Sequence, residues 1–144
     1  MMSRVVVRSA AAAAGVARMP ERGPWTVTVP GAVDSWGAAH SRFGRLPWAE
    51  LLAPAIELAC GFAASAGWVG AVERAAAVFG TDGDWARMYR ANGRPWRPGE
   101  RVALPALAQT LRILAAEGPA VLYAGVLGRR AATYLEGAGS PIRH

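Results

Sequence analysis

The chain has 144 residues, which is enough for one domain with a sizeable core, and 53% of them are hydrophobic, which excludes extensive disorder. Its formal net charge is +6, and all sixteen basic residues are arginines. The arginines are spread along the chain, the six tryptophans do not alternate with them, and no apolar run approaches the roughly 18 residues of a membrane span, so the composition argues against a nucleic-acid-binding domain and a membrane-spanning protein.

Residues 1–25 form a poorly defined N-terminal segment. The β-branched run Val5-Val6-Val7 predicts a possible short strand at residues 4–8. The first 20 residues contain arginines and alanines but no acid, as targeting segments do, yet Arg8 interrupts their apolar part. We therefore expect no functional signal peptide, and the compartment stays unknown.

Helical apolar patterns, punctuated by Gly and Pro, follow a second short strand that we expect at residues 26–29. We expect helices at residues 32–43, 47–60, 67–79, 84–89, 105–117 and 126–136. In the second helix, apolar residues at positions 48, 51, 52, 55, 56 and 59 predict one buried face. Pro54 lies within this pattern and lacks a backbone N–H, so we expect a break near Ala53 and a restart at Pro54.

Residues suited to nucleophilic or metal chemistry are scarce. The two histidines, His40 and His144, have no metal-ligand spacing. The single Cys60 excludes an internal disulfide, and its apolar surroundings are typical of a small core residue. Asp34, Ser35 and His40 fall on one short predicted helix, where a nucleophile, a base and an orienting acid do not easily line up.

The acidic residues show no convincing pair either. Glu50 and Glu57 are seven residues apart, which is more typical of a solvated helix stripe than of a glycosidase pair. The residues alone therefore predict a soluble helical domain with no catalytic residue, no metal and no cofactor.

The turns between the predicted helices are more specific than the composition. Residues 26–40 read TVTVPGAVDSWGAAH, and residues 42–62 read RFGRLPWAELLAPAIELACGF. Farther on come FGTDG, then GRPWRPGERVALPALAQTLRILAAEGPAVLYAG, and then YLEGAGSPI. In order and spacing, this succession over residues 26 to about 139 resembles the large-subunit region of γ-glutamyltranspeptidases, the γ-glutamyltransferase or glutathione hydrolase family.

The resemblance implies that residues 26–144 are the helical part of such a large subunit, an incomplete domain. The implied fold class is a mainly α segment of an α+β N-terminal-nucleophile hydrolase fold, a four-layer αββα stack in the full-length family. In that family a precursor cuts itself to expose a threonine, whose own α-amine can act as base when it attacks a γ-glutamyl amide. The acyl group then passes to water or to an amino acid. The implied partners are a γ-glutamyl substrate such as glutathione and the missing small subunit, with no nucleic acid.

The departures from the family limit what this chain does. The family's nucleophilic threonine lies in a glycine-containing segment that this sequence does not reach, so we expect no catalytic residue and a chain that is inactive alone. The family also has a substrate-binding arginine after a strand and before an Ala/Pro-rich stretch, and Arg8 is the best positional match. Its guanidinium is expected to hold the substrate α-carboxylate, although Ala10 stands where the family has proline.

Two other hypotheses stay open. One is a piece of a related acylase or capsule-processing enzyme, because the helical residues present do not select the acyl group. The other is a freestanding helical binding module for an acidic partner, which the net charge of +6 suits. The sequence leaves the physiological substrate, the oligomeric state and independent folding undetermined.

Overall fold

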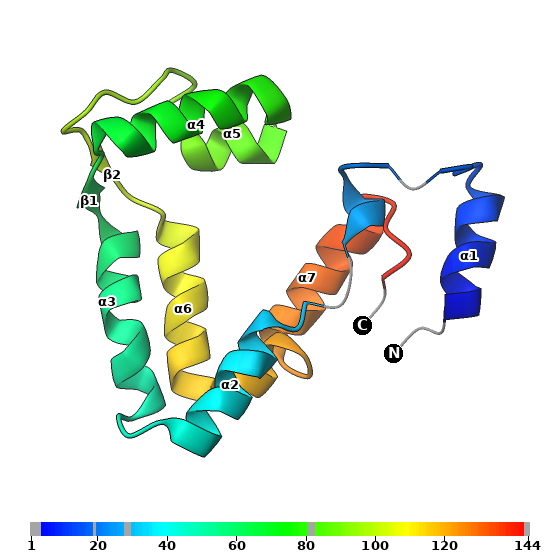
Figure 1. Ribbon diagram of the computed structural model, residues 1–144, viewed down its shortest axis with the longest axis horizontal. Helices are drawn as coiled ribbons and strands as arrows, with labels where there is room; N and C mark the ends of the chain where they lie inside the picture. Colours follow the sequence, from blue (N-terminus) through cyan, green and yellow to red (C-terminus); the bar gives the residue numbers. More distant parts are fainter. Residues whose placement is uncertain (1–3, 19, 28–29, 81–82, 143–144) are drawn as a thin grey trace. The chain divides into compact units, whose positions relative to one another are not determined.

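The computed structural model describes residues 4–18, 20–27, 30–80 and 83–142, with only the backbone described for residues 4–8. Helices and 3-10 turns dominate these residues (Figure 1). The elements are α1 (Arg4–Ala13), η1 (Pro24–Thr26), α2 (Ala32–Phe43), α3 (Trp48–Cys60), β1 (Phe62–Ala63), α4 (Ala66–Phe79), α5 (Gly83–Tyr89), β2 (Arg101–Val102), α6 (Pro105–Glu117), η2 (Pro119–Leu122) and α7 (Val126–Gly137). Among the described residues, no helix is both long and apolar enough to cross a membrane.

The helices bounded by Gly and Pro begin and end close to the predicted residues. Helix α2 has the predicted bounds, with Asp34 in its first turn, where a carboxylate suits the positive end of the helix dipole. Gly44 ends it and donates its backbone N–H to the His40 carbonyl. Helices α4, α6 and α7 match their predictions to within one residue at each end.

The two strands predicted near the N-terminus are not borne out in the described residues. Residues 4–8 belong to α1, because the arginines and the alanine run that follows favour a helix over an unpaired strand. Thr26 ends the 3-10 turn η1, and Val27 has no regular structure. The rest of the strand predicted at residues 26–29 lies outside the described residues.

Helix α3 corrects the prediction of a break at Pro54. The helix is continuous from Trp48 to Cys60 with Pro54 inside it. Proline removes one hydrogen bond, and the Glu50 carbonyl that this leaves without a helical donor is on an exposed turn, where water can satisfy it. The bonds of the neighbouring residues continue, so one missing donor does not divide the helix.

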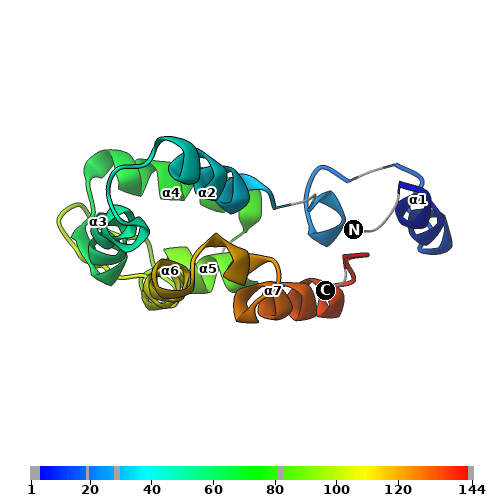
Figure 2. The same ribbon diagram turned by 90° about the horizontal axis from the view of Figure 1, so that it is seen from below.

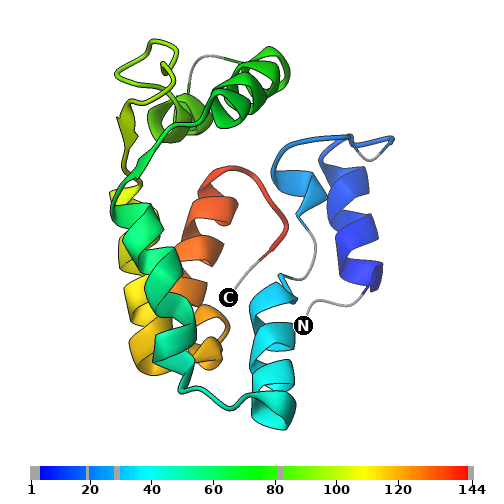
Figure 3. The same ribbon diagram turned by 60° about the vertical axis from the view of Figure 1, so that its left-hand side comes forward.

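The described residues fall into two compact units, one formed by residues 1–48 with 116–144 and the other by residues 49–115. In the second unit, α3 and α6 run side by side, as Figures 1 and 3 show. Strand β1 follows the C-terminal end of α3, and β2 precedes the N-terminal end of α6. The two strands form an antiparallel ladder that pairs Phe62 with Val102. Val102 is fully buried, so the ladder contributes this residue to the unit's core, whereas Ala63 and Arg101 are exposed.

In the first unit, η2 leads into α7, which is coloured orange in Figure 2. Helix α2 packs against η2, and the buried residues of this part come from η2, α7 and the turn after α7. They are Val121, Leu127, Gly128, Ala132 and Ser140.

Candidate functional site

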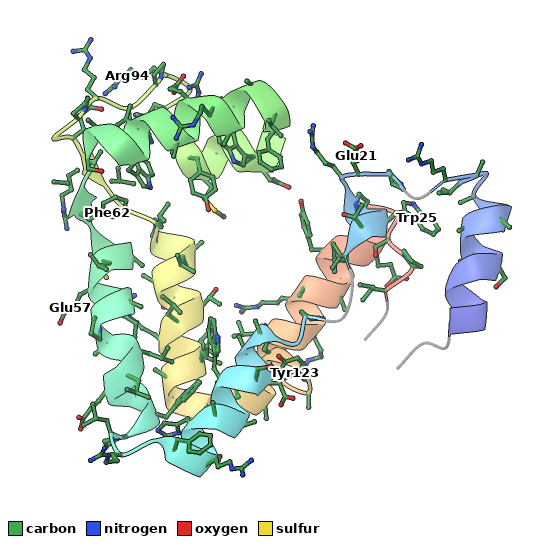
Figure 4. The ribbon with its side chains drawn as sticks, viewed as in Figure 1. Glu21, Trp25, Glu57, Phe62, Arg94 and Tyr123 are labelled. Atoms are coloured by element: carbon green, nitrogen blue, oxygen red, sulfur yellow. The ribbon has the colours of Figure 1, made fainter. Side chains whose placement is uncertain are left out.

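The Tyr123 hydroxyl joins two segments that lie far apart in the sequence (Figure 4). It donates a hydrogen bond to the Pro30 carbonyl at 2.7 Å and accepts one from the Asp34 backbone N–H at 2.8 Å. The residue before α2 is Gly31, which has no side chain to cap the helix. Tyr123 therefore takes the place of an N-cap side chain and holds Pro30 at the start of α2.

A second contact holds the same two segments together. A Cβ atom on Gly37 of α2 would lie only 2.6 Å from Cγ of Pro119 in η2. Real side-chain atoms do not approach so closely, so only glycine fits there. The glycine of the SWG sequence and the proline of the GP sequence thus form one packing contact between α2 and η2.

His40 secures the turn after α2. Its Nε2 lies 2.7 Å from the Leu46 carbonyl, a contact in which Nε2 must carry the proton and donate it. Its ring lies edge-on to Trp48, with 5.4 Å between the ring centroids. A Cβ atom on Gly44 would lie 2.3 Å from the His40 ring, so the glycine leaves room for it. These contacts give His40 a structural role in the FGRLP turn.

In the second unit, two arginines of different elements converge on Cys60. Arg112 donates from Nη2 to the Cys60 sulfur at 2.9 Å, and Arg101 donates from Nη2 to the Cys60 carbonyl at 3.2 Å. The thiol is partly buried. In the described part of the chain, the hydrogen-bond partners of Cys60 are arginines and not histidines, so the cluster lacks the base that a cysteine nucleophile uses.

Glu100 clamps the loop before β2. Arg94 donates to both of its carboxylate oxygens, at 2.8 and 3.0 Å, and the Arg97 backbone N–H donates at 2.9 Å. The Arg94 hydrogen bonds, followed by that from Arg97, hold the pKa of the Glu100 carboxyl below its ordinary value. This clamp organises the GRPWRPGE sequence, and Trp96 at its centre donates from its indole N–H to the Tyr89 carbonyl at 2.9 Å.

An ion pair joins α4 to the residue after α5. Arg90 donates from Nη1 to a Glu73 carboxylate oxygen at 2.6 Å. The Arg90 side chain is only 9% exposed, whereas that of Glu73 is 41% exposed. The pair therefore fixes a nearly buried guanidinium at the packed face of these two helices.

The structure keeps the sequence-predicted candidates apart from one another. Ser35 donates its hydroxyl to the Gly31 carbonyl, whereas His40 is bonded to Leu46, so no triad forms on α2, as expected. Glu57 projects on the side of α3 that faces away from α6 (Figure 4). The backbone of Arg8 lies in α1, and its side chain is outside the described residues.

The contacts of η2 and Tyr123 with α2 were not predicted from the sequence. In the sequence, Gly118-Pro119 predicts only the end of the helix at residues 105–117, and Tyr123 belongs only to the family resemblance. No local pattern predicts that either residue meets α2. Among the described residues, no group of three or more His, Cys, Asp or Glu is placed to hold a metal ion.

The chain is similar to known proteins in sequence. The sequence profile of the family described as gamma-glutamyltranspeptidase matches residues 4–144, which extends the resemblance upstream of residue 26. The Acylase ACY 1 proenzyme of Pseudomonas sp. (strain V22) is 40% identical over 121 residues, which are 83% of this chain and 22% of that protein. The chain thus spans about a fifth of the length of this curated relative.

Solved structures of similar sequence share the fold. The gamma-glutamyltranspeptidase from Pseudomonas nitroreducens superposes with a TM-score of 0.74 at 32% identity, covering 83% of this chain and 35% of that one. The cephalosporin acylase from Bacillus halodurans superposes with a TM-score of 0.76 at 28% identity, covering 93% and 27%. The profile match along the chain, together with these relatives, shows that the chain belongs to the gamma-glutamyltranspeptidase family.

Proposed function

We propose that this chain is the helical part of the large subunit of an enzyme that transfers a γ-glutamyl group to water or to an amino acid. The observation that carries the proposal is the profile match over residues 4–144. It is supported by the packing of α2 against η2, because Tyr123 contacts Pro30 and Asp34, and Pro119 packs closely against Gly37.

In this proposal the chain supplies scaffold, and a complementary small subunit supplies the nucleophilic threonine. The recorded hydrogen bonds of four described hydroxyls agree with a scaffold role, because all of them go to backbone groups and none to a base. These hydroxyls belong to Thr26, Ser35, Ser65 and Thr110. The substrate is a γ-glutamyl compound such as glutathione, and the reaction needs no cofactor.

The direct test is to incubate the purified chain with a γ-glutamyl anilide and follow release of the aniline. We expect a rate equal to that of a boiled sample, because the nucleophile is supplied elsewhere. Turnover clearly above the boiled control, lost when the chain is removed by its affinity tag, would refute the claim that these residues are scaffold only.

A related acylase is the second candidate, favoured by the 40% identity to the Acylase ACY 1 proenzyme. A chimera in which residues 4–144 replace the corresponding segment of the Pseudomonas nitroreducens enzyme is assayed with a γ-glutamyl anilide and with a cephalosporin side-chain amide. Because we expect the helical residues not to select the acyl group, retained γ-glutamyl turnover supports their role as scaffold in γ-glutamyl transfer. A shift of preference toward the cephalosporin amide would show that these residues do select the acyl group, and it would favour the acylase.

Arg8 is proposed to hold the α-carboxylate of the substrate. In the chimera, Arg8→Lys keeps the charge but loses the two-point hydrogen bonding, so we expect KM to rise at least about tenfold with little change in kcat. Arg18→Lys is the matched control, because it alters another arginine of the same N-terminal segment. An unchanged KM for Arg8→Lys would remove Arg8 from the substrate site.

A further inference from the structure

Helix α3 carries a second apolar face besides the one it buries. Leu52 and Ala59 are buried, but Leu51 and Leu58 are 45% and 61% exposed. Pro54 completes an exposed stripe, because residues three and seven positions apart share one side of a helix. We call Leu51, Pro54 and Leu58 the α3 stripe.

The α3 stripe has an acidic edge. Glu50 and Glu57 are exposed and lie seven residues apart, each next to a leucine of the stripe. Figure 4 shows Glu57 on the side of α3 away from α6, so the acid borders an open surface. A helix that is apolar on two sides is typical of one that is covered on both.

Helix α2 also carries an exposed apolar stripe, but the edge of this stripe is positively charged. Trp36 and Phe43 are 53% and 73% exposed, and the small residues Ala32 and Ala39 lie on the same side of the helix. We call these four residues the α2 stripe. Its edge is basic, because the Arg42 guanidinium lies 5.3 Å from the centre of the Phe43 ring.

The two stripes match in spacing and in charge. Trp36 and Phe43 are seven residues apart, as are Leu51 and Leu58, so the large side chains recur about every 10.5 Å along both helices. The gaps beside Ala32 and Ala39 are suited to receive leucine side chains, as in ridges-into-grooves packing. The edges of the two stripes carry opposite charges, with Arg42 on one and Glu50 and Glu57 on the other.

We propose that the α2 stripe of one copy of this chain binds the α3 stripe of a second copy, with Arg42 facing the acidic edge of the partner. The contact joins two different surfaces, so a bound pair still presents one free α3 stripe, on one copy, and one free α2 stripe, on the other. Association therefore continues beyond two copies or closes into a ring. This inference does not depend on the proposed enzyme activity.

Sedimentation velocity of the whole chain over about 1 to 200 μM measures the association. We expect the mean mass to rise above 15.1 kDa with concentration, and less steeply in high salt, which screens the charged edges. Phe43→Glu and Leu58→Glu each place a charge in the contact and are expected to weaken association at least about tenfold. Leu107→Glu is the matched control, because Leu107 is 42% exposed on α6 outside both stripes.

A mixing experiment separates this contact from general stickiness. The Phe43→Glu variant keeps an intact α3 stripe, and the Leu58→Glu variant keeps an intact α2 stripe. Each alone is expected to be monomeric, whereas a one-to-one mixture is expected to stop at a dimer of twice 15.1 kDa. Far-UV circular dichroism checks that both variants stay folded.

Three results overturn the proposal. They are a chain that is monomeric over the whole range, a Leu107→Glu variant that weakens association as much as the stripe variants, and a mixture that stays monomeric. The first means that some other partner covers the stripes. In addition, Arg42→Glu is expected to weaken association. The double variant Arg42→Glu with Glu57→Arg is expected to associate at least about threefold more tightly than Arg42→Glu alone, because the exposed charges are paired again.

Discussion

Replacing Tyr123 by phenylalanine removes one oxygen atom and leaves the ring in place. That oxygen makes two hydrogen bonds, one to the Pro30 carbonyl at 2.7 Å and one from the Asp34 N–H at 2.8 Å. A typical hydrogen bond contributes about 1 kcal/mol net, and the exposed partners allow water to replace part of each bond. We therefore expect Tyr123→Phe to lower the free energy of unfolding by about 1 to 2 kcal/mol, within the range for losing an N-cap.

Urea unfolding followed by circular dichroism measures this change, and native-state hydrogen exchange locates it. The Asp34 amide is expected to exchange about tenfold faster in the variant, because 1.4 kcal/mol corresponds to a factor of ten. Tyr89→Phe is the control, since it keeps the ring contact of Tyr89 with Trp85 at 5.6 Å, and we expect a change below about 0.5 kcal/mol. If Tyr123→Phe is as stable as the native chain and the Asp34 amide is no less protected, the reasoning on this contact is wrong.

Three further predictions follow from other contacts. Gly37→Ala places a Cβ atom 2.6 Å from Pro119, so we expect thermal unfolding to show a loss of about 1 to 2 kcal/mol in the free energy of unfolding. Gly70→Ala meets only the flexible end of Arg74 at 3.4 Å and is expected to stabilise α4 by about 0.5 to 1 kcal/mol. If both variants changed the free energy of unfolding in the same direction, the packing argument would be contradicted. Glu73→Gln leaves the nearly buried Arg90 without its counter-charge, and because Glu73 is itself 41% exposed we expect a loss of only about 1 to 2 kcal/mol in urea unfolding; a neutral result would show that the pair contributes nothing. The pKa of Glu100 is lowered in the folded chain, so its contacts stabilise the fold above the ordinary pKa of 4.5, and this stabilisation is lost as the pH falls through the folded pKa. We therefore expect the native chain to be more stable than Glu100→Gln at pH 6 to 7, and the difference in free energy of unfolding to shrink in acid. A difference that grows in acid would contradict this prediction.

Much of the helical architecture could be predicted from the sequence because glycine and proline mark where the helices end. Helix α2 begins after Pro30-Gly31 and ends at Gly44, and Gly118-Pro119 terminates α6. Gly118 has φ of +80°, a left-handed conformation that glycine adopts without strain. These signals are local, so a single sequence contains them.

The errors arose where local preference competed with context. Valine favours strands, yet residues 4–8 are helical in α1, since a strand needs a partner and the alanines that follow favour a helix. A break was predicted at Pro54 because proline lacks a donor, but α3 tolerates the loss of one hydrogen bond. In both cases a single local term, the strand preference of valine or the one hydrogen bond lost at Pro54, is outweighed by the helical hydrogen bonds of the neighbouring residues.

The buried face of α3 was predicted too wide. Leu51 was placed in it, but this residue is 45% exposed, whereas Leu52 and Ala59 are buried. Periodicity identifies apolar residues without saying which of two apolar faces is covered. That second face is where the structure points to association between copies.

The contacts that hold the motifs together could not be predicted from the sequence. Tyr123 and Pro30 are 93 residues apart, and no periodic pattern links a tyrosine in one turn to a carbonyl in another. The same holds for Cys60 and Arg112, which meet across α3 and α6. The family resemblance supplied the order of these segments, and only the structure shows which atoms of each segment meet.

The central claim is that residues 4–144 are the helical scaffold of a γ-glutamyl-transferring enzyme. The most direct measurement is the rate of γ-glutamyl anilide hydrolysis by the chimera in which these residues replace the corresponding segment of the Pseudomonas nitroreducens enzyme, to which 83% of this chain aligns at 32% identity. We predict that the chimera folds, separates into large and small subunits, and retains turnover that disappears when the small subunit's nucleophilic threonine is replaced by alanine. A chimera that folds and separates into its subunits but hydrolyses no γ-glutamyl anilide would contradict the claim.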